Sequence, residues 1–153
     1  GATNAINLDM QRWHADTQLE IANNTFVHTQ FWFGLLQTFK ASQPATPVPV
    51  RVCNNLILGG ERIQAGDEQL EHALAHWQFA ANWWERDVTT QPDADRNGRI
   101  AQAAESLAVP ERDAADAPEF LRPAPDSPLV SAGVGGDLPK YVGAKAPPPG
   151  TTN

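Results

Sequence analysis

The stretch EQLEHALAHWQFAANWW, residues 68–84, carries the most regular apolar pattern in the chain and dominates the expected fold. Apolar residues recur in it at spacings of three and four, and Asp67, immediately before it, is a suitable N-cap. This spacing predicts an amphipathic helix from Asp67 to about Arg86. Its apolar stripe consists of Leu70, Leu74, Trp77, Ala81 and Trp84.

A second long helix is expected from about Leu8 to Lys40, where apolar residues form two adjoining stripes at helical spacing. The triplet Asn23-Asn24-Thr25 is poor helix material, so this segment is either one kinked helix or two shorter ones. The main stripe consists of Ala15, Leu19, Ala22, Phe26, Phe33 and Leu36.

Residues 48–64 separate the two predicted helices and show a different period. Val48, Val50 and Val52 alternate with other residues as in a strand, and Gly59-Gly60 suits a tight turn. We therefore expect a small β-hairpin near 48–64. The predicted fold class is mainly α, with two long amphipathic helices, this hairpin between them, and a helical core over residues 1–90.

Residues 91–153 have a different composition, because they hold most of the 13 prolines and none of the 5 tryptophans. A short helix is predicted from Gly98 to Leu107, followed by an extended Pro/Ala-rich C-terminal arm. Such a segment cannot by itself bury enough apolar surface to offset its ordering entropy. We expect the arm to lie along a surface, either of its own chain or of another subunit.

Composition limits the partners that this chain could bind. The formal net charge of −7 argues against nucleic acid, which demands clustered Lys and Arg. No apolar run approaches the roughly 18 residues needed for a membrane span. Cys53 is the single cysteine, so an intrachain disulfide is ruled out and the redox compartment stays open. A processed or secreted chain is compatible with the Gly1 start, and the localisation is otherwise unknown.

Residues 93–105 begin like an EF-hand calcium loop, with acidic or amide side chains at alternate positions before Gly98. The pattern fails at its last ligand, because position 12 is Ala104 and Glu105 comes one residue late. The alternative reading is a set of Asx-turns that cap the short helix. The calcium hypothesis names Asp93, Asp95, Asn97, Arg99 and Glu105 as the site, and the ion would be structural.

A second candidate metal site lies on the predicted 67–86 helix. Glu68, His72 and His76 are spaced by four, so a helix would present them on one face, where two imidazoles could bind zinc or another transition metal. The alternative is an interface helix in which the imidazoles are hydrogen-bonded fillers. No HExxH or CxxC pattern supports the metal reading.

No sequence pattern for a catalytic site was found: GxSxG and phosphate-binding glycine motifs are missing, and Cys53 has no neighbouring His. We therefore expect a non-catalytic structural or accessory subunit of a larger assembly, formed with copies of itself or with other proteins. This subunit would dock by a helix face and strap a neighbour with its arm. The alternatives are a helical metal-binding protein and a calcium-stabilised secreted module, so Ca²⁺ or Zn²⁺ would be the cofactor, if any. The predicted partner-binding residues are Phe79, Trp83, Phe120, Leu121, Leu129, Leu138 and Tyr141.

Overall fold

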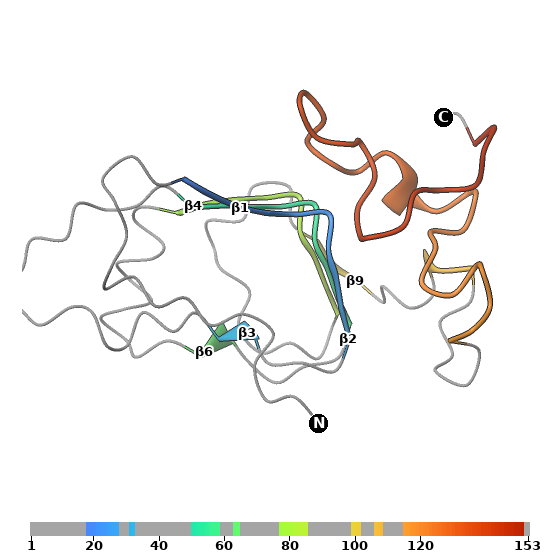
Figure 1. Ribbon diagram of the computed structural model, residues 1–153, viewed down its shortest axis with the longest axis horizontal. Coiled ribbons are helices and arrows are strands. Elements are labelled where there is room, and N and C mark those ends of the chain that lie inside the picture. Colours follow the sequence, from blue (N-terminus) through green and yellow to red (C-terminus); the bar gives the residue numbers. More distant parts are fainter. Residues whose placement is uncertain are drawn as a thin grey trace, which may run out of the picture.

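The fold is a stack of parallel β-strands, seen in a computed structural model (Figure 1). The structure describes residues 18–27, 31–32, 50–58, 63–64, 77–85, 99–101, 106–108 and 115–151. Successive passes of the chain each add one strand to two sheets, and the first two passes also contribute to a third. We call these passes coil 1 (β1–β3), coil 2 (β4–β6) and coil 3 (β7 and β8).

Coil 1 contains β1 (Leu19–Ala22), β2 (Thr25–Val27) and β3 (Phe31–Trp32). Coil 2 contains β4 (Val50–Cys53), β5 (Leu56–Leu58) and β6 (Ile63–Gln64), and coil 3 contains β7 (Trp77–Ala80) and β8 (Trp83–Glu85). The strand β9 (Arg99–Ala101) follows β8. The sheet orders are β1-β4-β7, β2-β5-β8-β9 and β3-β6, and every strand pair is parallel.

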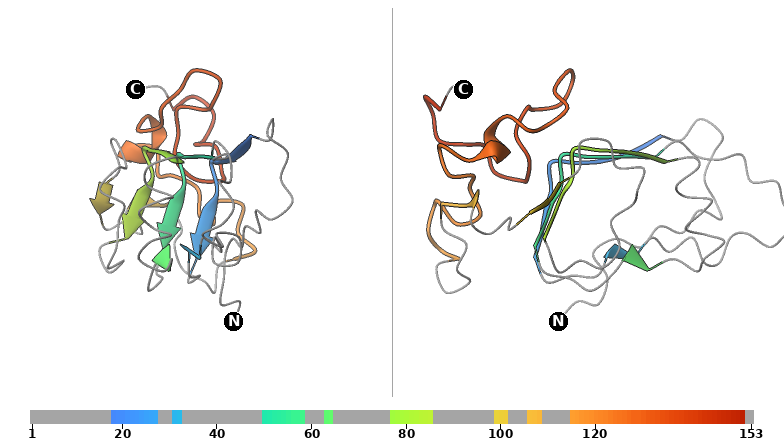
Figure 2. Two further views of the ribbon diagram at one scale, coloured as in Figure 1. Left: turned by 90° about the vertical axis from the view of Figure 1, so that its left-hand side faces the viewer. Right: turned by 180° about the vertical axis from the view of Figure 1, so that it is seen from behind.

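A sharp corner joins the first two sheets, so that β1, β4 and β7 turn together into β2, β5 and β8 (Figures 1 and 2). The register stacks equivalent residues of the coils on one another: Ile21 pairs with Val52, and Val52 with Phe79. All three side chains are buried, with exposed fractions of 7%, 1% and 3%. Such apolar stacking gives the coils one continuous core, as in other β-solenoids.

Strand alternation explains which side chains point away from this core. The residue directly before each of the buried residues Ile21, Val52 and Phe79 is polar. These polar residues are paired across β1, β4 and β7: Glu20 with Arg51, and Arg51 with Gln78. In the second sheet, Ile57 and Trp84 are paired and buried, whereas their neighbours Leu56 and Trp83 point to the opposite face. That opposite face is also apolar and needs its own cover.

The C-terminal arm, defined here as residues 115–151, supplies the cover. It runs through turns and bends and one 3-10 turn, η4 (Pro128–Val130), on the outer side of the corner (Figure 1). The arm therefore lies along its own chain, which is one of the two surfaces expected for it. Leu129 and Val142 of the arm are fully buried, in one cluster with Leu56, Leu58, Trp83 and Leu107.

The predicted mainly α, helical fold is wrong. Within residues predicted as helices 8–40 and 67–86, the described parts are the strands β1, β2, β3, β7 and β8, and the predicted helix from Gly98 to Leu107 contains β9. The predicted hairpin near 48–64 does contain strands, but β4, β5 and β6 pair in parallel with other coils and not with one another. Cys53 is the last residue of β4 and is buried.

The described residues contain no α-helix. The described residues therefore include no helix that is long and apolar enough to cross a bilayer, in agreement with the sequence, which predicts no membrane span.

Candidate functional site

The corner between the first two sheets is built from asparagine. Its first residue adopts a left-handed backbone conformation in each coil, with φ of 53° at Asn23, 58° at Asn54 and 55° at Ala81. Asparagine tolerates this region better than most residues with a Cβ, which explains its use in two of the three coils. The positive φ turns the chain from one sheet into the next within two residues.

The second corner residue of each coil forms the asparagine ladder, made of Asn24, Asn55 and Asn82. The Asn55 amide donates from Nδ2 to Ile21 O and to Asn82 Oδ1, both at 2.8 Å. Its Oδ1 accepts from Asn24 N and Nδ2, both at 3.0 Å. Asn55 and Asn82 are fully buried, and these bonds satisfy polar groups that would otherwise be costly to bury.

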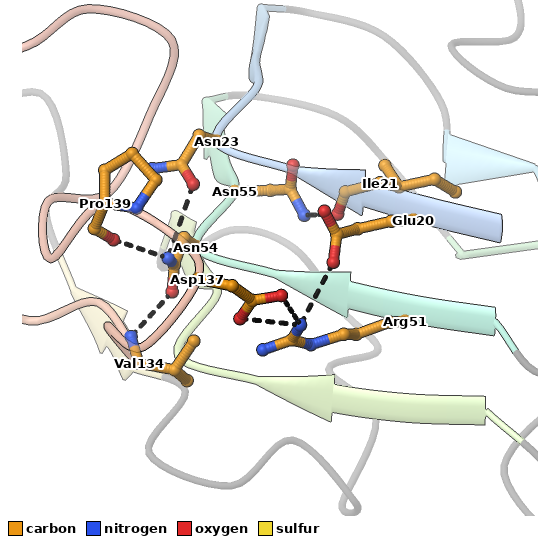
Figure 3. Close-up of polar contacts among 9 residues, drawn as sticks. All are labelled: Glu20, Ile21, Asn23, Arg51, Asn54, Asn55, Val134, Asp137 and Pro139. Atoms are coloured by element: carbon orange, nitrogen blue, oxygen red, sulfur yellow. Dashed lines mark hydrogen bonds and ion pairs between the residues drawn. The ribbon is translucent and has the colours of Figure 1, made fainter.

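The arm is fixed to the outside of the corner through Asn54 (Figure 3). The Asn54 side chain donates from Nδ2 to Pro139 O at 3.0 Å and accepts at Oδ1 from Val134 N at 2.9 Å. Its backbone carbonyl accepts from Gly143 N at 2.8 Å. One corner residue thus binds the arm at three points.

Coil 1 contributes two further bonds to the arm. Asn23 Nδ2 donates to Tyr141 O at 2.6 Å, and Thr25 Oγ1 accepts from Ala144 N at 2.9 Å. Both are directed at backbone groups of the arm, so they fix its path without requiring particular side chains there.

A polar hollow lies beside the arm on the outer face of β1, β4 and β7. Its volume is about 540 Å³, it is open to solvent, and it is lined by Gln18, Leu19, Glu20, Val50, Arg51, Gln78 and Asp137. Arg51 Nη1 donates to Glu20 Oε2 at 3.1 Å and to the two carboxylate oxygens of Asp137 at 3.2 and 3.1 Å (Figure 3).

The electrostatics of the hollow come from this three-residue ion group. The hydrogen bond from Arg51 holds the pKa of Asp137 below its ordinary value, and the same bond raises the pKa of Arg51. Asp137 belongs to the arm, so the group ties the arm to the first sheet. Its side chains are 33% to 73% exposed, and exposed ion pairs contribute little to stability.

The predicted metal residues fall largely outside the described part of the chain. Glu68, His72, His76, Asp93, Asp95, Asn97 and Glu105 all lie outside it, and Arg99 is described only as the first residue of β9. Among the residues that are described, no three His, Cys, Asp or Glu side chains gather as a metal site. Binding of calcium or of a transition metal stays a prediction.

The predicted partner-binding residues all lie in the described part. Phe79, Trp83 and Leu129 are buried within the chain, with exposed fractions of 3%, 1% and 0%. Phe120, Leu121, Leu138 and Tyr141 are half-buried in the arm. Burial of the first three leaves them no free surface for a partner in this structure, and the partner role of the half-buried four stays a prediction.

Sequence reasoning missed the corner residues, although a signal for them exists. The segments IANNTFV (21–27), VCNNLIL (52–58) and FAANWW (79–84) align on their asparagines, which lie 31 and 27 residues apart. An internal repeat of this length is typical of solenoids and would have revealed both the fold and the ladder.

Fold and site together define a parallel β-solenoid whose corner is clamped by a C-terminal arm. Comparison of the chain with family models, curated proteins and solved structures found no match.

Proposed function

We propose that the protein is a non-catalytic structural subunit of a larger protein assembly, in which the coil stack is the rigid body against which other subunits dock. One observation carries the proposal: the coils are joined by the same set of hydrogen bonds at both coil–coil junctions. An interface that repeats in this way is suited to structures built by adding units side by side.

The use of the buried polar groups also supports a scaffold. Asn55 and Asn82 hold coils together, and Asn54 holds the arm. Networks that are satisfied in this way rigidify a structure and specify one arrangement. A rigid body is what a docking subunit has to present, because a flexible one would lose more entropy on assembly.

The strapping of a neighbour by the arm is the second part of the proposal. The arm would make, on a neighbour, the contacts that Leu129 and Val142 make on their own chain with Leu56 and Trp83. Exchange of an identical element between copies needs no new interface, since the contacts already exist within one chain.

Native mass spectrometry of the protein isolated from its source, before and after treatment with a chelator, tests the proposal. We expect a mass well above the 16.6 kDa of the chain, unchanged by the chelator. A mass of one chain would refute assembly, and a mass lost on chelation would favour the metal alternatives.

A matched pair of variants tests the arm. Leu129→Ala removes a fully buried contact of the arm, whereas Pro128→Ala changes its exposed neighbour. If the arm straps a neighbour, the first variant weakens the assembly, so that it dissociates at a higher protein concentration than the unchanged protein, and the second variant does not. Equal assembly of both variants, with circular dichroism showing intact strands, would refute the strapping.

A further inference from the structure

The asparagine ladder has a direction along the stack. Asn24 donates from N and Nδ2 to Asn55 Oδ1, and Asn55 donates in the same way to Asn82 Oδ1, over distances of 2.8–3.1 Å. In return, Asn55 and Asn82 each donate from Nδ2 to a carbonyl of the preceding coil, Ile21 O and Val52 O. Coils 2 and 3 therefore each offer an Oδ1 acceptor to the coil before it.

The backbone of the corner repeats the same direction. Asn23 N and Asn54 N donate to carbonyls of the following coil, Cys53 O at 3.2 Å and Ala80 O at 3.1 Å. In the opposite sense, Leu56 N donates to Asn24 O, and Trp83 N to Asn55 O, both at 2.8 Å.

Coil 1 carries the equivalent groups, but in the part of the chain that the structure describes no other coil is stacked before it. Each of β1, β2 and β3 has one strand neighbour there. Asn24 Oδ1 accepts no hydrogen bond from the described residues, and Asn24 Nδ2 turns back to Ala22 O of its own coil at 3.1 Å. Thr25 N occupies the position from which Leu56 and Trp83 donate to a preceding coil.

From this edge we infer a docking site for a segment of a partner protein that adds one further coil in parallel, with an asparagine in the ladder position. The inference rests on the proposed function and names the surface and the chemistry of the partner. The partner's asparagine would donate from N and Nδ2 to Asn24 Oδ1, and its backbone carbonyl would accept from Thr25 N. Ala22 O would accept from the partner's corner, which releases the Asn24 amide to reach the added coil. Strand addition to an open edge is an established mode of peptide recognition.

The far end of the described stack favours a different protein over a second copy as the partner. Among the described residues, β7 is the edge of its sheet, whereas β8 pairs with β9. The edge strands that these residues offer, β7 and β9, therefore do not flank one corner. The described part of a second copy thus presents no strand–corner–strand unit to β1 and β2.

A peptide of this chain provides the probe, because coil 2 already precedes coil 3 in the required way. The probe is the segment 50–58 with Cys53→Ala, a change that matches Ala22 and Ala80 in the same register position and prevents oxidation. The control peptide carries Asn55→Ala in addition. Both are labelled with a fluorophore and titrated with the full chain by fluorescence anisotropy, and hydrogen exchange is followed at single amides by NMR.

We expect saturable binding of the probe, weakened at least tenfold in the control peptide, and exchange of the Thr25 amide slowed at least tenfold with the Leu56 amide unchanged. Absence of saturable binding, equal binding of the two peptides, or unchanged exchange at Thr25 would each overturn the inference. If these tests fail and the isolated protein still has a mass well above one chain, the inference falls and the assembly proposal stands. A single-chain mass together with positive peptide tests would refute the assembly proposal and support the docking site.

Discussion

The Asn55→Ala substitution tests the structural account of the ladder most directly. It removes four side-chain hydrogen bonds, two donated to Ile21 O and Asn82 Oδ1 and two accepted from Asn24. At about 1 kcal/mol net for each bond, the free energy of unfolding should fall by about 4 kcal/mol. The site is fully buried, so water has poor access to the groups left behind. Because domains are stable by only about 5–15 kcal/mol, such a loss is large.

Asn24→Ala is the matched control at the open end of the same ladder. It removes two bonds, from Nδ2 to Ala22 O and to Asn55 Oδ1, at a half-buried position. The bond from Asn24 N to Asn55 Oδ1 is kept because the backbone donates it. We expect a loss of about 1–2 kcal/mol, at most half of that for Asn55→Ala.

Urea unfolding followed by circular dichroism and tryptophan fluorescence measures both losses, provided that the slope of free energy against denaturant stays the same. The double variant should be more stable than the sum of the single losses predicts, by about 1 kcal/mol, since the two residues share a bond. Equal losses for the two single variants, or a loss below about 1 kcal/mol for Asn55→Ala, would refute a cooperative buried ladder.

Three further predictions concern the arm. Leu129→Ala should lower the free energy of unfolding by about 3 kcal/mol, measured by urea unfolding, because the side chain is fully buried; an unchanged value would show that the arm does not pack as described. Gly133→Ala should cost about 1–3 kcal/mol in the same assay, since a Cβ there would lie 2.8 Å from the Lys140 carbonyl, and no loss would contradict that close approach. Asp137 should titrate below its ordinary pKa in an NMR titration, and Arg51→Gln should return it upward. The stability that this carboxylate adds is then present above its unfolded-state pKa and is lost as the pH falls through the lowered folded-state pKa. If Arg51→Gln left the pKa of Asp137 unchanged, the ion group would be refuted.

The sequence predicted regularly spaced apolar residues but assigned them to the wrong periodic structure. Leu19, Ala22 and Phe26 are spaced by three and four, which matches a helix. In the structure Leu19 and Ala22 belong to β1 and Phe26 to β2, and the two-residue corner at Asn23-Asn24 changes the phase between the strands. A strand period interrupted by a short corner can therefore imitate a helical stripe over about two turns.

The same imitation occurs at Trp77, Ala81 and Trp84, which belong to β7, the corner and β8. Trp84 is fully buried, as expected for a core residue. The unfavourable helix propensity of Asn23-Asn24-Thr25 was the local indication against a helix, because asparagine favours the left-handed region that the corner needs.

The contacts of the arm could not be predicted from local sequence. Asn54 and the arm residues that it binds lie 80 to 89 positions apart, and the arm has no period that points to its partner. Its composition predicted only that it would be extended or disordered by itself, and the three-dimensional structure identifies its own corner as the surface along which it lies. The polar hollow likewise depends on Asp137 reaching Arg51 across 86 positions.

The separation in sequence between the arm and its binding site also fixes an order of events in folding. Asn23 and Tyr141 are 118 positions apart, and Thr25 and Ala144 are 119 apart, so these bonds close only after residues 141 and 144 have been synthesised. Coil-to-coil bonds span 26 to 34 positions and can form earlier. Until the arm arrives, the outer faces of Leu56, Leu58 and Trp83 have no cover from it. A ribosome that stalls or terminates before residue 129 would thus release a chain with a formed stack and a bare apolar face, which is a substrate for chaperones and for aggregation.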